Sequence, residues 1–310
     1  MRVMGDKVTK DRKRVLFGSF CGVMTGICWG VSGVWGQFLF ETRGIDSNWI
    51  VPIRLFSGGI VLLIYMFLKN REQMVTLVKN KRDFLQAILT GVLGTMMFQL
   101  TFFGAVQRSN AGTATVLQYL CPVMTMIYVC MRDKKKPEKI EVLSIILALA
   151  GIFVISTHGN PNALAITPDA LIWGIATAFF MFMSTVLPEG LYKKYSSMVV
   201  LSWGFLIGGI IQLFIFKPWE YDVKIDIMVI IAMLFIVLGG CVFAYVFYGN
   251  AIKRIGAARS SLFAASEPIA AALLSAVWLK TEFLLIDLLG FALILSTIFL
   301  LTKPDAIPAE

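Results

Sequence analysis

The sequence places a carboxylate, Glu267, directly before Pro268 near the middle of an apolar segment, residues 257–282. The segment is long enough to cross a lipid bilayer, and a carboxylate at that depth is costly unless it faces protein or water. The proline removes a backbone donor and leaves the carbonyl of Ala264 without its helical partner. Two interpretations stay open: the pair lines a solute or ion pathway, or it is a packed kink whose neutral carboxyl bonds the loosened backbone.

Other polar and aromatic side chains lie inside apolar segments, where each either contacts a solute or packs between helices. Trp29, Ser32 and Gly36 share one helical face, a pattern that also suits a packing seam of small residues. Arg54 lies near the start of its segment, so it either contacts an anion at the outer mouth or snorkels to the headgroups as an anchor. The further candidates for solute binding are Gln99, Gln118, Tyr119, Ser184, Tyr245, Tyr248 and Glu267.

The sequence carries no motif for nucleotide, metal or catalytic chemistry. His158 is the single histidine, and the five cysteines lie in apolar runs without a CxxC pair. No GxxxxGK[ST] loop occurs, so the chain brings no P-loop of its own. We therefore expect no catalytic residue, no metal site and no cofactor, and the chain is not expected to be an enzyme.

Composition indicates an integral membrane protein. Of the 310 residues, 58% are hydrophobic and 15% are charged, whereas soluble domains are about one quarter charged. The 28 Lys and Arg residues outnumber the 19 Asp and Glu residues. Because they stand in short connectors between apolar runs, the excess indicates membrane topology and not a nucleic-acid partner.

The apolar runs predict an all-α protein with ten transmembrane helices. The first run is longer than the core of a signal peptide, so we predict that it is retained as a helix. Lys and Arg gather in alternate connectors, so the positive-inside rule places both termini in the cytoplasm and the chain in the cell membrane. The runs lie at about 16–40, 49–68, 84–107, 112–131, 140–157, 169–190, 198–216, 227–251, 258–279 and 284–302.

The two halves of the chain resemble each other. Residues 104–127 match residues 250–273 at one constant offset, which places Pro122 on Pro268. Each half holds five predicted helices, and an odd number gives the two copies opposite orientations in the membrane. Inverted repeats of this kind hold their solute sites near the midplane, beside interrupted helices. Pro122 and Pro268 are therefore predicted helix breaks with a role in gating.

Two such copies resemble the EamA-type branch of the drug/metabolite transporter (DMT) superfamily. The residues that carry the resemblance are TGICWGVSGVWG (25–36), Arg54, AGTATVLQYLCP and AARSSLFAASEP. The resemblance implies two inverted five-helix bundles around a central cavity, and transport of small metabolites, often amino acids and often outward. Glu267 matches the Glu-Pro pattern of the family, whereas Cys121 precedes the proline of the first copy. The predicted regions are a cytoplasmic tail (1–16), a first repeat (17–157), an outer linker (158–169), a second repeat (170–303) and a cytoplasmic tail (304–310).

These observations predict a secondary active transporter that moves a small polar metabolite, an amino acid or related compound, by alternating access, with export as the favoured direction. The expected partners are the solute, a coupling proton or cation, and the lipid bilayer. Glu267 is expected to take up a proton or to pair with a cationic group during the cycle.

Three alternatives stay open. The first is an importer of a quaternary ammonium solute such as choline, with Trp29, Tyr119, Tyr245 and Tyr248 as an aromatic cage and Glu267 as the counter-charge. The second is a membrane-embedded enzyme, and the third is a passive channel or assembly subunit. Counterflow of solute distinguishes a carrier from the last of these.

Overall fold

The computed structural model describes residues 2–134, 136–158, 160 and 165–301, and its regular secondary structure is helical throughout these ranges. The first half contains α1 (Arg2–Arg43), α2 (Ser47–Lys79), α3 (Lys81–Leu89), the π-helix η1 (Thr90–Met96), α4 (Met97–Arg108), α5 (Ala111–Gln118), α6 (Cys121–Arg132) and α7 (Lys139–Thr157). The second half contains α8 (Pro168–Val186), α9 (Glu189–Tyr192), α10 (Ser197–Phe216), the 3-10 helix η2 (Pro218–Glu220), α11 (Ile227–Leu234), the π-helix η3 (Phe235–Phe243), α12 (Ala244–Ile255), α13 (Ala257–Ala264), α14 (Ser266–Trp278) and α15 (Leu285–Leu301).

The predicted all-α membrane architecture is confirmed. Within the described ranges, nine helical stretches are long and apolar enough to cross a membrane, and Leu285–Leu300 forms a shorter apolar helix, as ten spans require. Large apolar side chains cover the outside of the bundle, for example Leu68, Leu149 and Phe214. Such a surface is stable against lipid and not against water. The first helix starts at Arg2, so the basic segment at the N-terminus forms the first turns of α1.

Among the described spans, four are interrupted in corresponding places of the two halves, in addition to a kink at Asn70 in α2 and a break between α8 and α9. The π-helix η1 joins α3 to α4, and η3 joins α11 to α12. The fourth span breaks between α5 and α6, just before Pro122. The ninth breaks at Ala265, three residues before Pro268. Each proline lies in the first turn of the following helix, where its missing N–H disrupts no bond of that helix.

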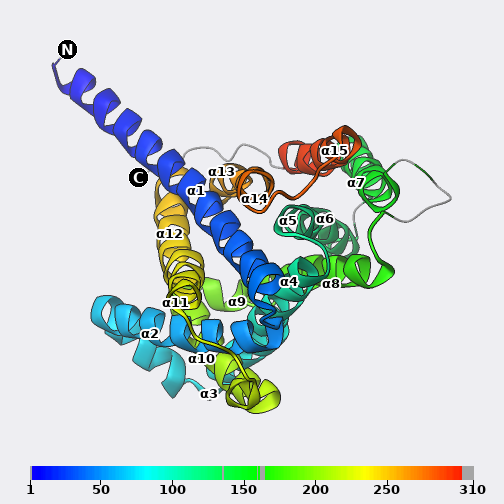
Figure 1. Cartoon of the computed structure of the whole chain (residues 1–310). Helices are drawn as coiled ribbons and strands as arrows, with labels where there is room; N and C mark the ends of the chain where they lie inside the picture. Colours follow the sequence, from blue (N-terminus) through cyan, green and yellow to red (C-terminus); the bar gives the residue numbers. More distant parts are fainter. Residues whose placement is uncertain (1, 135, 159, 161–164, 302–310) are drawn as a thin grey trace.

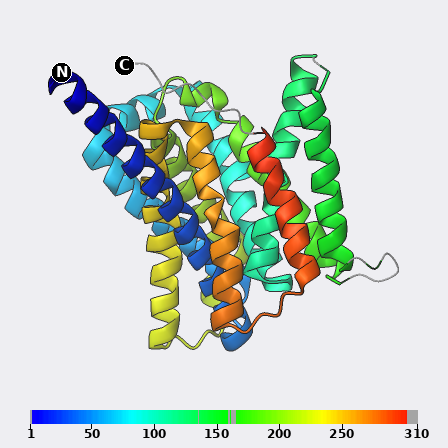
Figure 2. The ribbon, with the colours of Figure 1, turned by 90° about the horizontal axis from the view of Figure 1, so that it is seen from above.

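The helices pack in matching pairs (Figure 1). α2 lies along α10 on one side of the bundle, and α7 lies along α15 on the other. Between these pairs, α1 packs against η3, α12, α13 and α14, while α8 packs against η1, α4, α5 and α6. The two central helices thus pack across the halves: α1 packs against elements of the second half, and α8 packs against the corresponding elements of the first half. Figure 2 shows that α1 starts, and α15 finishes, at the same end of the bundle.

The contact between α2 and α10 is made backbone to backbone. Gly59 lies against Leu206, where an added Cβ would stand 2.6 Å from the backbone nitrogen of Leu206. In return, Gly209 lies against the backbone of Phe56. Glycine is required at both positions because any side chain would push the two helices apart.

We expect Gly209→Leu to destabilise the bundle, because the leucine side chain would occupy the space that the backbone of Phe56 fills. Overpacking of this kind costs about 1–3 kcal/mol. The measurement is the melting temperature of the purified protein in detergent. Gly239→Ala is the matched control, since a Cβ at Gly239 meets no other atom within 4 Å. If Gly209→Leu has the same melting temperature as the wild type, the glycine is not required for the contact between α2 and α10.

Candidate functional site

Glu267 stands in the first turn of α14 and is only 4% exposed. Its carboxyl group is held by two side chains from the broken span of the other half. Gln118 donates from Nε2 to Oε1 at 3.0 Å, and the hydroxyl of Tyr119 lies 3.4 Å from Oε2. The carboxyl therefore joins the two halves of the chain at their helix breaks.

Tyr119 also satisfies the backbone that Pro268 loosens. Its hydroxyl donates to the carbonyl oxygen of Ala264 at 3.1 Å, which is the acceptor that the sequence predicts to lose its helical partner. A phenol has one hydrogen to give. With that hydrogen on Ala264, the phenol oxygen can accept a hydrogen bond from a protonated Glu267. The Tyr119 hydroxyl therefore links the freed carbonyl of Ala264 to the carboxyl group of Glu267.

α1 reaches this break because it presents glycines to it. A Cβ at Gly30 would stand 2.8 Å from the carbonyl oxygen of Glu267, and one at Gly26 would stand 2.7 Å from its backbone nitrogen. Ser266 donates from Oγ to the carbonyl oxygen of Val23 at 3.0 Å, which fixes α1 to the start of α14. The glycine pattern of α1 thus brings its backbone against the first turn of α14.

An aromatic group lies beside the carboxyl group and is formed by Trp29 on α1 with Tyr245 and Tyr248 on α12. The ring centroids of Trp29 and Tyr245 are 5.3 Å apart in an edge-on arrangement, and those of Trp29 and Tyr248 are 5.6 Å apart. Trp29 directly precedes Gly30, which lies against the backbone of Glu267. The aromatic group therefore adjoins the start of α14.

Arg54 lies in the interior and not at the outer mouth. Its side chain is 3% exposed; Nε donates to Sγ of Cys241 at 3.0 Å, and the guanidinium lies 4.6 Å from the centre of the Phe103 ring. Gly240 leaves space for both Arg54 and Ser32, since a Cβ there would stand 3.0 Å from Nη2 of Arg54 and would clash with Ser32 Oγ. The expectation that Arg54 snorkels to the headgroups is wrong, because this face of α2 is covered by α4 and η3.

Two other predicted residues lie apart from the carboxyl group in the described contacts. Gln99 is buried on α4. Ser184 donates to the carbonyl oxygen of Met181 on its own helix, and its backbone faces Gly94 of η1. Their place in a solute site stays a prediction.

Sequence reasoning missed three residues that shape the site. Phe103 covers Arg54, Phe205 stacks edge-on against Tyr245 with ring centroids 5.5 Å apart, and Gly240 leaves room for Arg54 and Ser32. Gly240 carried a usable signal, since it falls opposite Gly94 in the comparison of the two halves. The two phenylalanines carried none, because apolar rings are common throughout the chain.

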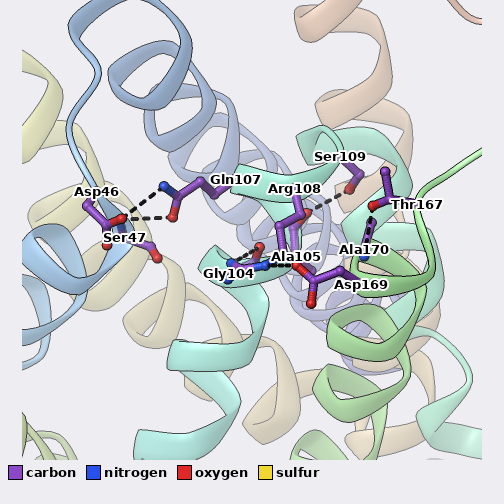
Figure 3. Close-up of polar contacts among 10 residues, drawn as sticks. All are labelled: Asp46, Ser47, Gly104, Ala105, Gln107, Arg108, Ser109, Thr167, Asp169 and Ala170. Carbon is purple, nitrogen blue, oxygen red and sulfur yellow. Dashed lines mark hydrogen bonds and ion pairs between the residues drawn. The ribbon is translucent and has the colours of Figure 1, made fainter.

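Figure 3 shows a second polar cluster, where the end of α4 meets the starts of α2 and α8. Gln107 donates from Nε2 to Asp46, 3.2 Å away. Arg108 forms an ion pair with Asp169 and lies 4.3 Å from the centre of the Trp173 ring. The charge of Arg108 is thus neutralised within the protein. A cavity of about 480 Å³ adjoins the cluster and is lined by Asp46, Ser47, Asn48, Leu100, Gln107, Arg108, Trp173 and Phe216.

A second cavity, of about 450 Å³, lies between α2, α10 and α12. Its lining residues include Val246, Gly249 and Asn250, which follow Tyr245 along α12, together with Lys69 and Lys253. The helix that carries Tyr245 and Tyr248 therefore also borders this cavity.

Comparison with known proteins identifies the fold and the family. The model of the EamA-like transporter family matches residues 16–157 and 169–303. The uncharacterised inner membrane transporter YicL of Salmonella typhimurium is 32% identical over 280 residues, which is 90% of this chain and 93% of YicL. The uncharacterised transporter YetK of Bacillus subtilis is 25% identical over 84% of this chain and 82% of its own length.

One crystal structure covers 93% of this chain and 96% of its own, with a TM-score of 0.61 and 14% identity. At that identity the match shows a shared fold and nothing about the solute. The family model, in contrast, covers almost the whole sequence in two segments. The chain therefore belongs to the EamA-like transporter family and is a multi-pass membrane transporter.

Proposed function

We propose that the chain is a secondary active transporter that moves a small polar metabolite across the cytoplasmic membrane by alternating access, with export as its direction. The observation that carries the proposal is the buried carboxyl of Glu267, held by Gln118 and Tyr119 between two helix breaks. A carboxyl group at this depth, bonded across the two halves, changes its contacts whenever the halves move relative to each other.

Two inverted copies are part of this proposal. The exchange of packing partners between α1 and α8 supports it, as do the paired helix breaks and the paired π-helices η1 and η3. In such an arrangement, rocking one bundle against the other opens a central site alternately to the two sides. The distribution of Lys and Arg supports cytoplasmic positions for both ends of the chain.

The free energy for transport comes, in this proposal, from the gradient of the solute or of a coupled proton or cation, since the sequence has no nucleotide-binding loop. Glu267 is the group proposed to exchange the proton or to pair with the cation. Tyr119 supports this role because its oxygen, 3.4 Å away, can accept a hydrogen bond from a protonated carboxyl group.

A second candidate function is import of a quaternary ammonium solute such as choline. The observation that favours it is the aromatic group, whose ring faces attract a cation when a carboxylate lies nearby. Competition separates the two functions. Tetramethylammonium is expected to inhibit transport by a cation importer, whereas neutral amino acids are expected to inhibit transport by a metabolite exporter.

We expect Glu267→Gln to fold and insert as the wild type does, but to lose concentrative transport. An amide has nearly the same shape and can still accept the hydrogen bond from Gln118, but it carries no titratable proton. A stability screen against a metabolite library first identifies a solute that raises the melting temperature. Accumulation of that labelled solute against its gradient in proteoliposomes is then measured for both proteins.

Glu282→Gln is the control for this experiment, because Glu282 lies in the connector after α14, outside the spans. It is expected to transport as the wild type does. Full concentrative transport by Glu267→Gln would remove the carboxyl group from the mechanism.

Tyr119→Phe is expected to destabilise the protein by about 1–3 kcal/mol, because it leaves the carbonyl of Ala264 without the donor that now satisfies it. The melting temperature in detergent measures this effect. Tyr128→Phe, on the adjoining α6, is the matched control, because the Tyr128 ring packs edge-on against Phe182 and keeps that contact without its hydroxyl. Equal melting temperatures for the two variants would show that Ala264 finds another donor.

A further inference from the structure

Four charged side chains are buried within the described ranges: Arg54, Asp83, Glu267 and Asp287. Asp83 pairs with Lys194 at 2.9 Å, and Asp287 pairs with His158. Neither Arg54 nor Glu267 forms an ion pair with any described residue. Because an unpaired buried charge is costly, these two positions require an explanation beyond packing. Gln118 already binds Glu267, so Arg54 is the less satisfied of the two.

The guanidinium of Arg54 has fewer hydrogen-bond partners among the described residues than it has donors. It has five N–H donors, yet its described partners are the thiol sulfur of Cys241, a weak acceptor, and the face of the Phe103 ring. Its Nη1 is buried and makes no hydrogen bond to any described residue. No charged acceptor among the described residues therefore lies within hydrogen-bond or ion-pair distance of the Arg54 guanidinium.

Ser32 supplies a second unused group at the same place. Its Oγ is buried and has no hydrogen-bond partner among the described residues. Ser32 Oγ and Arg54 Nη2 both approach Gly240, the glycine of η3 that lacks a side chain to fill the space between them. Two buried donors from α1 and α2 thus converge beside a bare stretch of backbone.

We propose that Arg54 and Ser32 bind the carboxylate of the transported solute, which makes that solute a carboxylate compound and not a purely cationic one. The inference rests on the proposed transport function and deepens it. A carboxylate offers two acceptor oxygens in the plane of the guanidinium fork, which is the geometry that arginine binds best. It would satisfy Nη1, accept from the Ser32 hydroxyl and neutralise the buried charge.

The test is binding of matched probes to the purified protein at neutral pH, measured as the rise in melting temperature with concentration. The probes are the twenty L-amino acids, acetate and succinate, each compared with its amide. We expect at least one carboxylate to stabilise the wild type and its amide to fail. Stabilisation by no carboxylate in this set, or equal stabilisation by the amide, overturns the proposal.

Variants then assign the effect to Arg54. Arg54→Gln is expected to weaken binding of the stabilising carboxylate on the order of 30-fold, and Arg54→Lys, which keeps the charge but loses the fork, to give an intermediate loss. Arg43→Gln is the matched control, since Arg43 also lies over a phenylalanine ring but is exposed and paired with Asp226. Unchanged affinity in Arg54→Gln overturns the proposal. If neither Arg54 variant folds, the comparison of carboxylate with amide on the wild type decides.

Counterflow in proteoliposomes distinguishes the failure of this inference from the failure of the proposed function. Counterflow of choline or of an amino acid amide, without counterflow of any carboxylate, would overturn the carboxylate site and leave the transporter intact. Carboxylate binding that depends on Arg54, in a protein without counterflow of any probe, would support the site and remove the transport mechanism.

Discussion

The hydrogen bonds from Gln118 and Tyr119 to Glu267 are the contacts on which the centre of this molecule depends. They join the broken span of the first half to the broken span of the second. Tyr119 also satisfies the carbonyl that Pro268 frees. One side chain therefore contacts both the carbonyl that the proline frees and the carboxyl group beside it.

The remaining interior is arranged around this junction by small residues. Glycines of α1 allow its backbone to touch the start of α14, and Gly240 lets Ser32 and Arg54 approach the same stretch of η3. Membrane helices gain little from excluding water, so close backbone contact and internal polar bonds must hold them together. Charges at the end of α4 are paired within the protein, whereas those at the centre are not. This contrast is the reason for proposing that Arg54 and Ser32 contact a solute.

Much of this arrangement could be predicted from the sequence. Apolar runs gave the spans, because hydrocarbon thickness fixes their length, and each predicted break has its proline in the first turn of the next helix. The burial of the Arg54 side chain could not be predicted, since it depends on which face of α2 packs against α4 and η3. The π-helices η1 and η3 were also not predicted. They are rare variants with i→i+5 hydrogen bonds inside otherwise α-helical spans, and the sequence carries no simple signal for them. The hydroxyl of Ser184 donates to a carbonyl of its own helix, a contact that the sequence pattern did not indicate.

The crossing of α2 and α10 constrains how the molecule can change shape. Gly59 and Gly209 bring the two backbones into contact with no side chain between them, so the pair cannot slide lengthwise without steric collision. The crossing therefore fixes both the spacing and the lengthwise register of α2 against α10.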